Sequence, residues 1–207
     1  MATNHHRFQS LAWPVNAIAG FIVVVACFVY LPLGVVAFLW FLYLQLLITI
    51  PQRLAPFGDK TSVTAPLDGI ITDISTDGAA HHIDIMAHLT CSQIIFCPCD
   101  GVIEDNLWID GLYLPASDGV APSFNARREI MIEMKTGEMI IMSLIAQSFT
   151  RLCQSPVAQG QLVYQSEPIG LSLMRARIRI SVPKSFSIMV NQGQSCLGIE
   201  TIIAKHP

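Results

Sequence analysis

Three arginines alternate with apolar residues in the C-terminal part of this 207-residue chain. Arg175, Arg177 and Arg179 occupy every second position. Because side chains on a β-strand alternate between its two faces, this spacing predicts three guanidinium groups on one face of a sheet. Guanidinium groups bind phosphates and carboxylates, so the pattern indicates a site for a lipid phosphate or an acidic partner. The alternative is a solvated, charged sheet face without a ligand.

The cysteines lie at spacings that do not favour metal binding. The six are Cys27, Cys91, Cys97, Cys99, Cys153 and Cys196. Cys97 and Cys99 are separated by a single proline, which is tighter than the two-residue spacing of zinc knuckles, and no pair of cysteines or histidines has a zinc-like spacing. We therefore expect no metal site, and thiols that are buried and chemically inert.

The composition indicates a membrane-embedded part. The mean hydropathy is +0.52, with 52% hydrophobic and only 13% charged residues, whereas soluble domains carry about 25% charged residues. The net charge of −3 gives no indication of a nucleic-acid partner.

The apolar residues concentrate in one segment, residues 17–50, which contains no charged residue. It follows a polar N-terminus, residues 1–16, and is too long for one span of about 20 residues. Pro32 and Gly34 lie near its middle and favour a break in a helix. The segment thus predicts a transmembrane helical hairpin with arms at 17–30 and 35–50. A single long, kinked span is the alternative, and arms this short leave open whether they cross the bilayer fully.

Basic residues flank the apolar segment on both sides. Arg7 precedes it, and Arg53 and Lys60 follow it. Because positive charge is retained on the cytoplasmic side of a membrane, this distribution predicts that both ends of the hairpin are cytoplasmic. We expect a bacterial-type inner membrane protein with a soluble domain on the cytoplasmic side.

Residues 51–207 have the pattern of a mainly β domain with few helices. Short segments rich in β-branched or alternating apolar residues are separated by turn signals such as Asp68-Gly69 and Asp100-Gly101. The expected strands are 63–65, 69–74, 82–86, 129–134, 139–145, 175–182 and 187–190. Only residues 143–154 could form a longer helix. A domain of this length can bury its own core.

Six short segments of this domain keep a common order and spacing. They are residues 49–56, 65–69, 98–101, 125–127, 145–151 and 193–201. In order and spacing they resemble the phosphatidylserine decarboxylase family, in its short, membrane-anchored, archaeal type. The resemblance implies that Asn125, Arg127 and Arg151 lie near the site for a lipid substrate; the alternative is that these residues only support turns and the edge of the core.

The resemblance also implies a cofactor made from the chain itself. In the family, a serine after a glycine becomes a pyruvoyl group by self-cleavage, assisted by a histidine that an acid orients. Ungapped matching places the Gly-Ser pair on Arg175-Ala176 and the histidine on Gln93, and only the acid is retained, as Asp68. Alanine has no nucleophile and an amide is no general base near neutral pH.

The rest of the chain offers no substitute for these groups. None of the 13 glycines is followed by Ser, Thr or Cys. His88 lies five residues from Gln93 and on another phase of the strand, so an ordinary surface or core role suits it better. Asp68 precedes a glycine and can equally serve a turn. We therefore expect no pyruvoyl group.

These absences predict a pseudoenzyme rather than a working decarboxylase. The first hypothesis is a non-catalytic accessory subunit that binds integral membrane proteins or an active paralogue. The second is a sensor or carrier of membrane phospholipids. The third is an active decarboxylase that forms phosphatidylethanolamine with some other cofactor.

Overall fold

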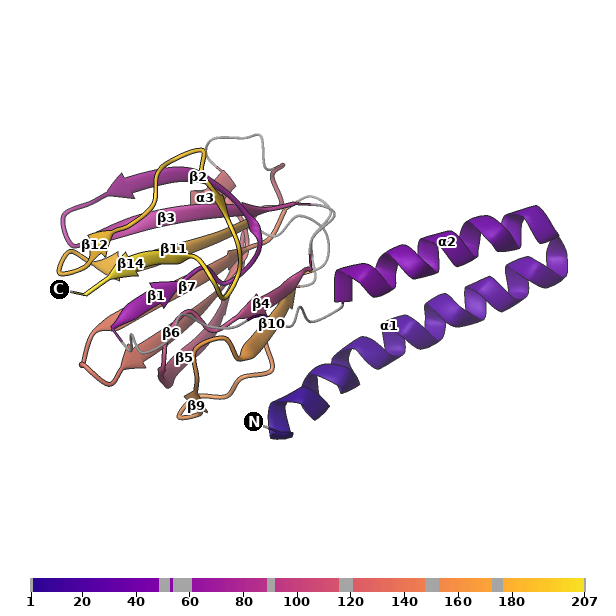
Figure 1. Cartoon of the computed structure of the whole chain (residues 1–207), viewed down its shortest axis with the longest axis horizontal. Helices are drawn as coiled ribbons and strands as arrows, with labels where there is room; N and C mark the ends of the chain where they lie inside the picture. Colours follow the sequence, from indigo (N-terminus) through magenta and orange to yellow (C-terminus); the bar gives the residue numbers. More distant parts are fainter. Residues whose placement is uncertain are drawn as a thin grey trace. The chain divides into compact units, whose positions relative to one another are not determined.

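The computed structural model describes residues 2–48, 53, 61–88, 92–115, 121–147, 153–172 and 177–206. The chain divides into two compact units, Met1–Pro51 and Gln52–Pro207. The first contains the helices α1 and α2 and the second contains the strands (Figure 1).

The first unit is a pair of helices joined at a single residue. Helix α1 spans Ala2–Val29 and helix α2 spans Leu31–Ile48. Pro32 lies in the first turn of α2, where a helix does not need its missing N–H group. Helix α1 begins at Ala2, whereas the predicted first arm of the hairpin began at residue 17. The polar N-terminal segment is therefore part of the helix.

Small residues line the contact between the two helices. Ala19 and Ala26 are buried there. A Cβ atom on Gly34 would lie 2.5 Å from Cys27 Sγ and 2.8 Å from Cys27 Cα. Residues this small let two helix backbones approach closely, which is how helices associate in an apolar environment.

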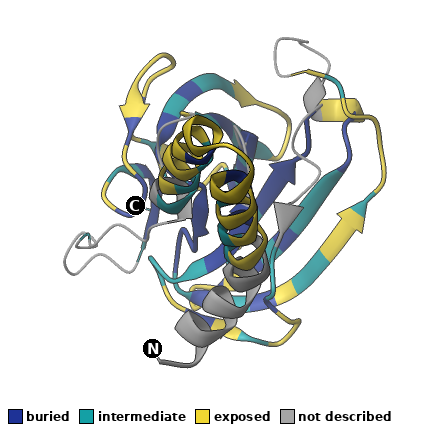
Figure 2. Cartoon of the chain, turned by 90° about the vertical axis from the view of Figure 1, so that its right-hand side faces the viewer, coloured by how far each residue is buried: buried dark blue, intermediate teal, exposed yellow. Residues whose placement is uncertain are grey.

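A hydrogen bond between side chains joins the helices, and most of their described apolar side chains are exposed. Gln45 Nε2 donates to Asn16 Oδ1 at 3.1 Å. Phe28 and Leu31 are among the large apolar side chains that are exposed, and the described parts of both helices are mostly exposed in Figure 2. No helix within the described residues meets the length and apolarity that a membrane crossing needs.

The second unit is mainly β, which confirms the predicted class of fold. The described part forms antiparallel sheets in the orders β1-β14-β12, β4-β10-β8 and β13-β2-β3-β11-β7-β6-β5-β9. The strands are β1 Ser62–Thr64, β2 Gly69–Thr76, β3 Ala80–Ala87, β4 Ile94–Phe96, β5 Gly101–Ile109, β6 Arg127–Met134, β7 Met139–Ile145, β8 Cys153–Gln154, β9 Leu162–Val163, β10 Pro168–Ser172, β11 Arg177–Pro183, β12 Ser187–Ile188, β13 Ser195–Cys196 and β14 Ile202–Lys205. One short helix, α3, spans Ala121–Phe124.

The core lies against one face of the large sheet. Ile83 and Ile85 on β3 and Ile178 and Ile180 on β11 are fully buried. They pack in one cluster with residues of the two small sheets. Each such side chain contributes about 1.5–3 kcal/mol of burial free energy. Because strand side chains alternate, the opposite face of β3 and β11 is left to polar groups.

The predicted helix at 143–154 is wrong at both ends. Ser143 to Ile145 belong to β7, which pairs with both β11 and β6, and Cys153–Gln154 is β8. Residues 148–152 lie outside the described residues. A short continuous apolar run fits a buried strand as well as a helix, and here pairing with two neighbouring strands decides the outcome.

Candidate functional site

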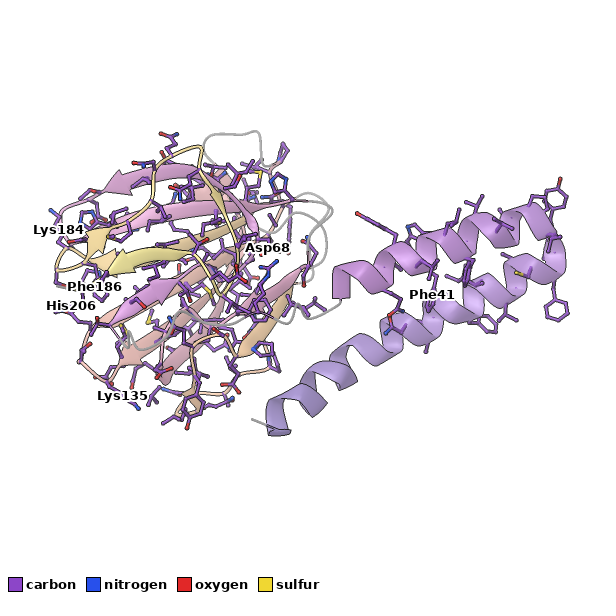
Figure 3. The ribbon with its side chains drawn as sticks, in the orientation of Figure 1. Phe41, Asp68, Lys135, Lys184, Phe186 and His206 are labelled. Carbon is purple, nitrogen blue, oxygen red and sulfur yellow. The ribbon has the colours of Figure 1, made fainter. Side chains whose placement is uncertain are left out.

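One row of paired residues crosses six strands at one end of the large sheet. From β2 to β5 it consists of Ile70, Met86, Arg177, Ile145, Arg127 and Ile109. We call this end of the sheet the site end, because Asp68 lies two residues before Ile70. In Figure 3, Asp68 lies at this end of the β domain, whereas Lys184, Phe186 and His206 lie at the other.

Asp68 is held by an arginine and by a backbone N–H group. Both terminal nitrogens of Arg53 donate to its carboxylate, with Nη2 2.8 Å from Oδ2. The N–H of Gly198 donates to Oδ1 at 2.8 Å, and Arg53 Nη1 also reaches the Gly198 carbonyl at 3.1 Å. This largely buried carboxylate is therefore part of a structural ion pair, and its lone pairs are directed at these partners.

The turn that presents Gly198 to Asp68 is strained. Ile199 has φ of 76°, a conformation that β-branched residues rarely adopt. Its side chain is buried, and its N–H donates to the Ala65 carbonyl at 2.9 Å. Burial and hydrogen bonding stabilise the strained backbone, so the Gly198 N–H has a fixed direction.

Gln93, onto which the resemblance places the family's histidine, makes a backbone contact. The side chain is completely buried, and its Nε2 donates to the His88 carbonyl at 2.9 Å. His88 itself is exposed just after β3. An amide in this position fixes the path of the chain but cannot accept a proton from a nucleophile.

Two of the three alternating arginines bind one buried acid. Asp84, on β3, accepts hydrogen bonds from Arg179 Nε at 2.7 Å, Arg179 Nη2 at 3.0 Å and Arg177 Nη2 at 2.8 Å. Burial raises the pKa of Asp84, but the two guanidinium groups outweigh burial and hold the pKa below its ordinary value. Arg177 is itself nine-tenths buried, and its Nε has no hydrogen-bond partner within the described part of the chain.

The polar residues that the resemblance placed near a substrate have structural partners. Asn125 is fully buried; its Nδ2 donates to the carbonyls of Leu114 and Ala146, and its Oδ1 accepts from the Leu114 N–H. Arg127 Nε donates to Glu129 Oε1 at 2.6 Å. These contacts favour the supporting role for both residues, although their role in binding remains a prediction.

Three of the predicted site residues lie outside the described residues. They are Arg151, Arg175 and Ala176. The predicted site residues that are described are therefore Asp68, Gln93, Asn125, Arg127 and Arg177, with Arg179 two residues further along β11.

The described thiols near the core are buried. Burial raises the pKa of Cys97 far above its ordinary value, that of Cys99 to about 12 and that of Cys196 to about 11. A thiol with so high a pKa is a poor nucleophile and a poor metal ligand at neutral pH.

Two residues of the site end had no signal strong enough to find from sequence. Asp84 is a lone acid in the alternating segment His82 to Met86, where a charged residue usually indicates an exposed face. Arg53 flanks the apolar segment and belongs to the motif at residues 49–56, but neither pattern predicts that it binds Asp68. Both assignments depend on contacts between distant segments, which spacing does not report.

The comparisons agree with the motif order. The family model for phosphatidylserine decarboxylase matches residues 48–204. A phosphatidylserine decarboxylase proenzyme of Ehrlichia chaffeensis is 30% identical over 164 residues, which cover 74% of this chain and 71% of the relative. Proenzymes of the same name from Rickettsia rickettsii and Wolbachia sp. subsp. Brugia malayi are 27% and 28% identical, over 83% and 74% of this chain and 77% and 71% of theirs.

The mainly β fold and these matches define a β domain of the phosphatidylserine decarboxylase type. The chain belongs to the phosphatidylserine decarboxylase family.

The comparisons contradict the expected pseudoenzyme and its role as a non-catalytic accessory subunit. The relatives carry the name of the decarboxylase proenzyme, and nothing in the described residues positively indicates a non-catalytic role. The expectation depended on missing residue types. The absence of a Gly-Ser pair excludes one route to a reactive carbonyl, but it does not by itself exclude catalysis.

The residues present do not fit a pyruvoyl group formed by the family's self-cleavage. The resemblance places the family's serine on Ala176, and the chain has no glycine followed by a hydroxyl or thiol residue. In the structure, Gln93 is a buried amide bonded to backbone, and Asp68 is paired with Arg53. Neither of these two side chains is thus arranged to activate a hydroxyl.

Proposed function

We propose that this chain acts on phosphatidylserine and that decarboxylation of the lipid is its reaction. The observation that carries the proposal is the family match over residues 48–204, together with the name shared by the relatives. We assign no step to a pyruvoyl group. An active chain must therefore obtain its electron sink by chemistry other than cleavage at a Gly-Ser pair.

The helical hairpin is proposed to insert into a membrane with both ends on the cytoplasmic side. Residues 17–50 contain no charged residue. The hairpin closes on small residues and leaves Phe28 and Leu31 exposed, a distribution that an apolar environment favours. Basic residues on both sides support the orientation. Membrane phospholipids and integral membrane proteins are the partners that such a segment could meet.

The headgroup is proposed to bind at the site end through Arg177, with Arg175 and Arg179. Arg177 belongs to the row that starts at Ile70, two residues after Asp68, and its buried Nε makes no hydrogen bond within the described part of the chain. A guanidinium group can bind a phosphate and a carboxylate, and phosphatidylserine has both. Asp84 keeps the two described arginines oriented.

Decarboxylation is tested with phosphatidylserine labelled at the serine carboxyl carbon. The full chain is purified in detergent, and released carbon dioxide is measured beside a mock preparation from the same host, which reports contaminating enzyme. We expect release above the mock level, from a chain whose intact mass remains 22.7 kDa. Release no greater than the mock level, from folded protein, would refute the reaction. Inhibition by hydroxylamine would show that a carbonyl takes part.

Headgroup binding is tested separately by native mass spectrometry in detergent. Replacing Arg175, Arg177 and Arg179 by glutamine is expected to reduce the phosphatidylserine retained relative to phosphatidylcholine. Lys184→Gln, at the other end of the domain, is the matched control and is expected to retain the lipid. Equal retention by the triple variant and the control would contradict the proposed role of the arginines.

A further inference from the structure

Apolar and aromatic side chains are exposed where β5 ends and β6 begins. Leu112 is 55% exposed and Phe124 is 59% exposed, and Trp108 and Tyr113 are also exposed. We call these four residues the apolar rim. Figure 2 shows exposed stretches at the periphery of the β domain around strands with buried centres.

The apolar rim belongs to the site end of the sheet. Ile109 of β5 pairs with Arg127 of β6, and both are members of the row that crosses to Ile70. Trp108 precedes Ile109, and Phe124 lies three residues before Arg127. The exposed apolar groups are therefore at the same end of the sheet as Asp68 and Arg177.

The segment that carries the apolar rim is fixed in place. The Leu112 N–H donates to the Phe124 carbonyl at 2.8 Å, and the Ala126 N–H donates to the Leu112 carbonyl at 2.8 Å. Gly111 packs so closely on the backbone of 124–126 that a Cβ would lie 2.5 Å from the Phe124 oxygen. The buried side chain of Asn125 adds three further bonds to Leu114 and Ala146. Because these contacts hold the backbone of the segment, the exposure of its apolar side chains is a defined feature of the fold.

The polar groups beside the apolar rim suit the polar interface of a phospholipid bilayer. The guanidinium of Arg128 lies 5.8 Å from the centre of the Trp108 ring, and its Nη1 donates to Asn106 Oδ1. The indole N–H of Trp108 donates to Asp110 Oδ1 at 2.7 Å, so the one polar group of this side chain already has a hydrogen-bond partner. Aromatic rings with polar tips, together with arginines, are typical of the interface between headgroups and acyl chains.

From these observations we propose that the apolar rim docks the site end on the surface of a phospholipid bilayer. The side chains of Leu112, Trp108 and Phe124 enter the interface, and Arg128 lies near lipid phosphates. Docking would bring Arg177 close to the headgroups. The inference rests on the proposed function only for this last step, since the exposed rim and its supports do not depend on any reaction.

The test uses Trp108 as a reporter in the full chain. The chain has three tryptophans, so Trp13→Phe and Trp40→Phe together leave Trp108 alone. This variant is reconstituted into phosphatidylcholine vesicles with phosphatidylserine, prepared with or without bromine on the acyl chains. We expect brominated lipid to quench Trp108 emission. Emission that is equal in the two kinds of vesicle would overturn the proposal.

Substitutions in the apolar rim separate docking from other contacts. Leu112→Asp and Phe124→Asp are each expected to lose most of the quenching, whereas Met189→Asp, at a residue that is 56% exposed outside the rim, retains it. A rim that self-associates would instead show unquenched emission and dimers that Phe124→Asp abolishes, which also overturns the proposal. Quenching without release of carbon dioxide would uphold docking and refute only the reaction.

Discussion

At the scale of single residues, the site end is dominated by charges that are already paired. Asp68 is bonded to Arg53 and Gly198, and Asp84 is bonded to Arg177 and Arg179. Such pairs orient guanidinium groups, and the burial of each charge is tolerated only because its counter-charge is present. Removing one member leaves a buried charge without its counter-charge, which costs more than the intact pair contributes.

Asp84→Asn is expected to lower the free energy of unfolding by about 3–5 kcal/mol. The change leaves Arg177, which is nine-tenths buried, without an ionic partner. Urea unfolding of the full chain in detergent measures the effect. Glu104→Gln, on an exposed acid of β5, is the control and should change stability by less than about 0.5 kcal/mol. Equal effects of the two substitutions would mean that the arginines find other partners.

The same acid predicts how stability depends on pH. The pKa of Asp84 is lowered in the folded chain, so its ionised form stabilises the fold above the ordinary aspartate pKa of about 4. That contribution is lost as the pH falls through the lowered pKa. The stability difference between the wild type and Asp84→Asn should therefore shrink below about pH 4. Unfolding midpoints at several pH values test this, and a constant difference would contradict it.

At the scale of elements, small residues decide how closely α1 and α2 approach. Gly34 packs against Cys27, whereas Gly20 has no atom within 4 Å of the place where a Cβ would lie. The two glycines thus form a matched pair inside helices, in which alanine is normally preferred by up to about 1 kcal/mol.

Gly34→Ala and Gly20→Ala are expected to change helix stability in opposite directions. Alanine at position 20 should stabilise the hairpin slightly, and alanine at position 34 should destabilise it through the contact with Cys27. Thermal unfolding in detergent, followed by helical circular dichroism at 222 nm, compares them. Stabilisation by both substitutions would show that the helices can separate enough to admit the methyl group.

The elements that the sequence predicted well are those with a clear local pattern. Residues 69–74, 82–86 and 139–145 alternate or are β-branched, and all are strands. The helix at 143–154 failed because an apolar run has no period that separates a helix from a buried strand. Asp68 can be singled out from the sequence because its Asp-Gly motif is local. Its partners Arg53 and Gly198 are 15 and 130 residues away, so only the folded chain brings them together.

At the scale of the whole molecule, the apolar composition of the N-terminal segment predicts that alkaline carbonate does not extract the chain from membranes. Because residues 17–50 lack charge and most of the apolar side chains described between residues 17 and 45 are exposed, the full chain should remain in the membrane fraction after alkaline carbonate. Replacing both Val25 and Leu39 by arginine should release it, since each charge in an apolar span costs about 2.5–3.5 kcal/mol. Immunoblots of pellet and supernatant measure the distribution. Release of the unsubstituted chain by carbonate would contradict the proposed insertion.

The pairing of β1 with β14 also determines when the domain can fold during synthesis. Ser62 pairs with Lys205, and Asp68 obtains its N–H donor from Gly198. The ribosome produces the helical hairpin first, and β1 then has no partner until β14 has been translated. The acid at the site end therefore acquires its environment only near the completion of the domain. A chain stalled before residue 198 would expose Asp68 and the edge of β1 to chaperones and proteases.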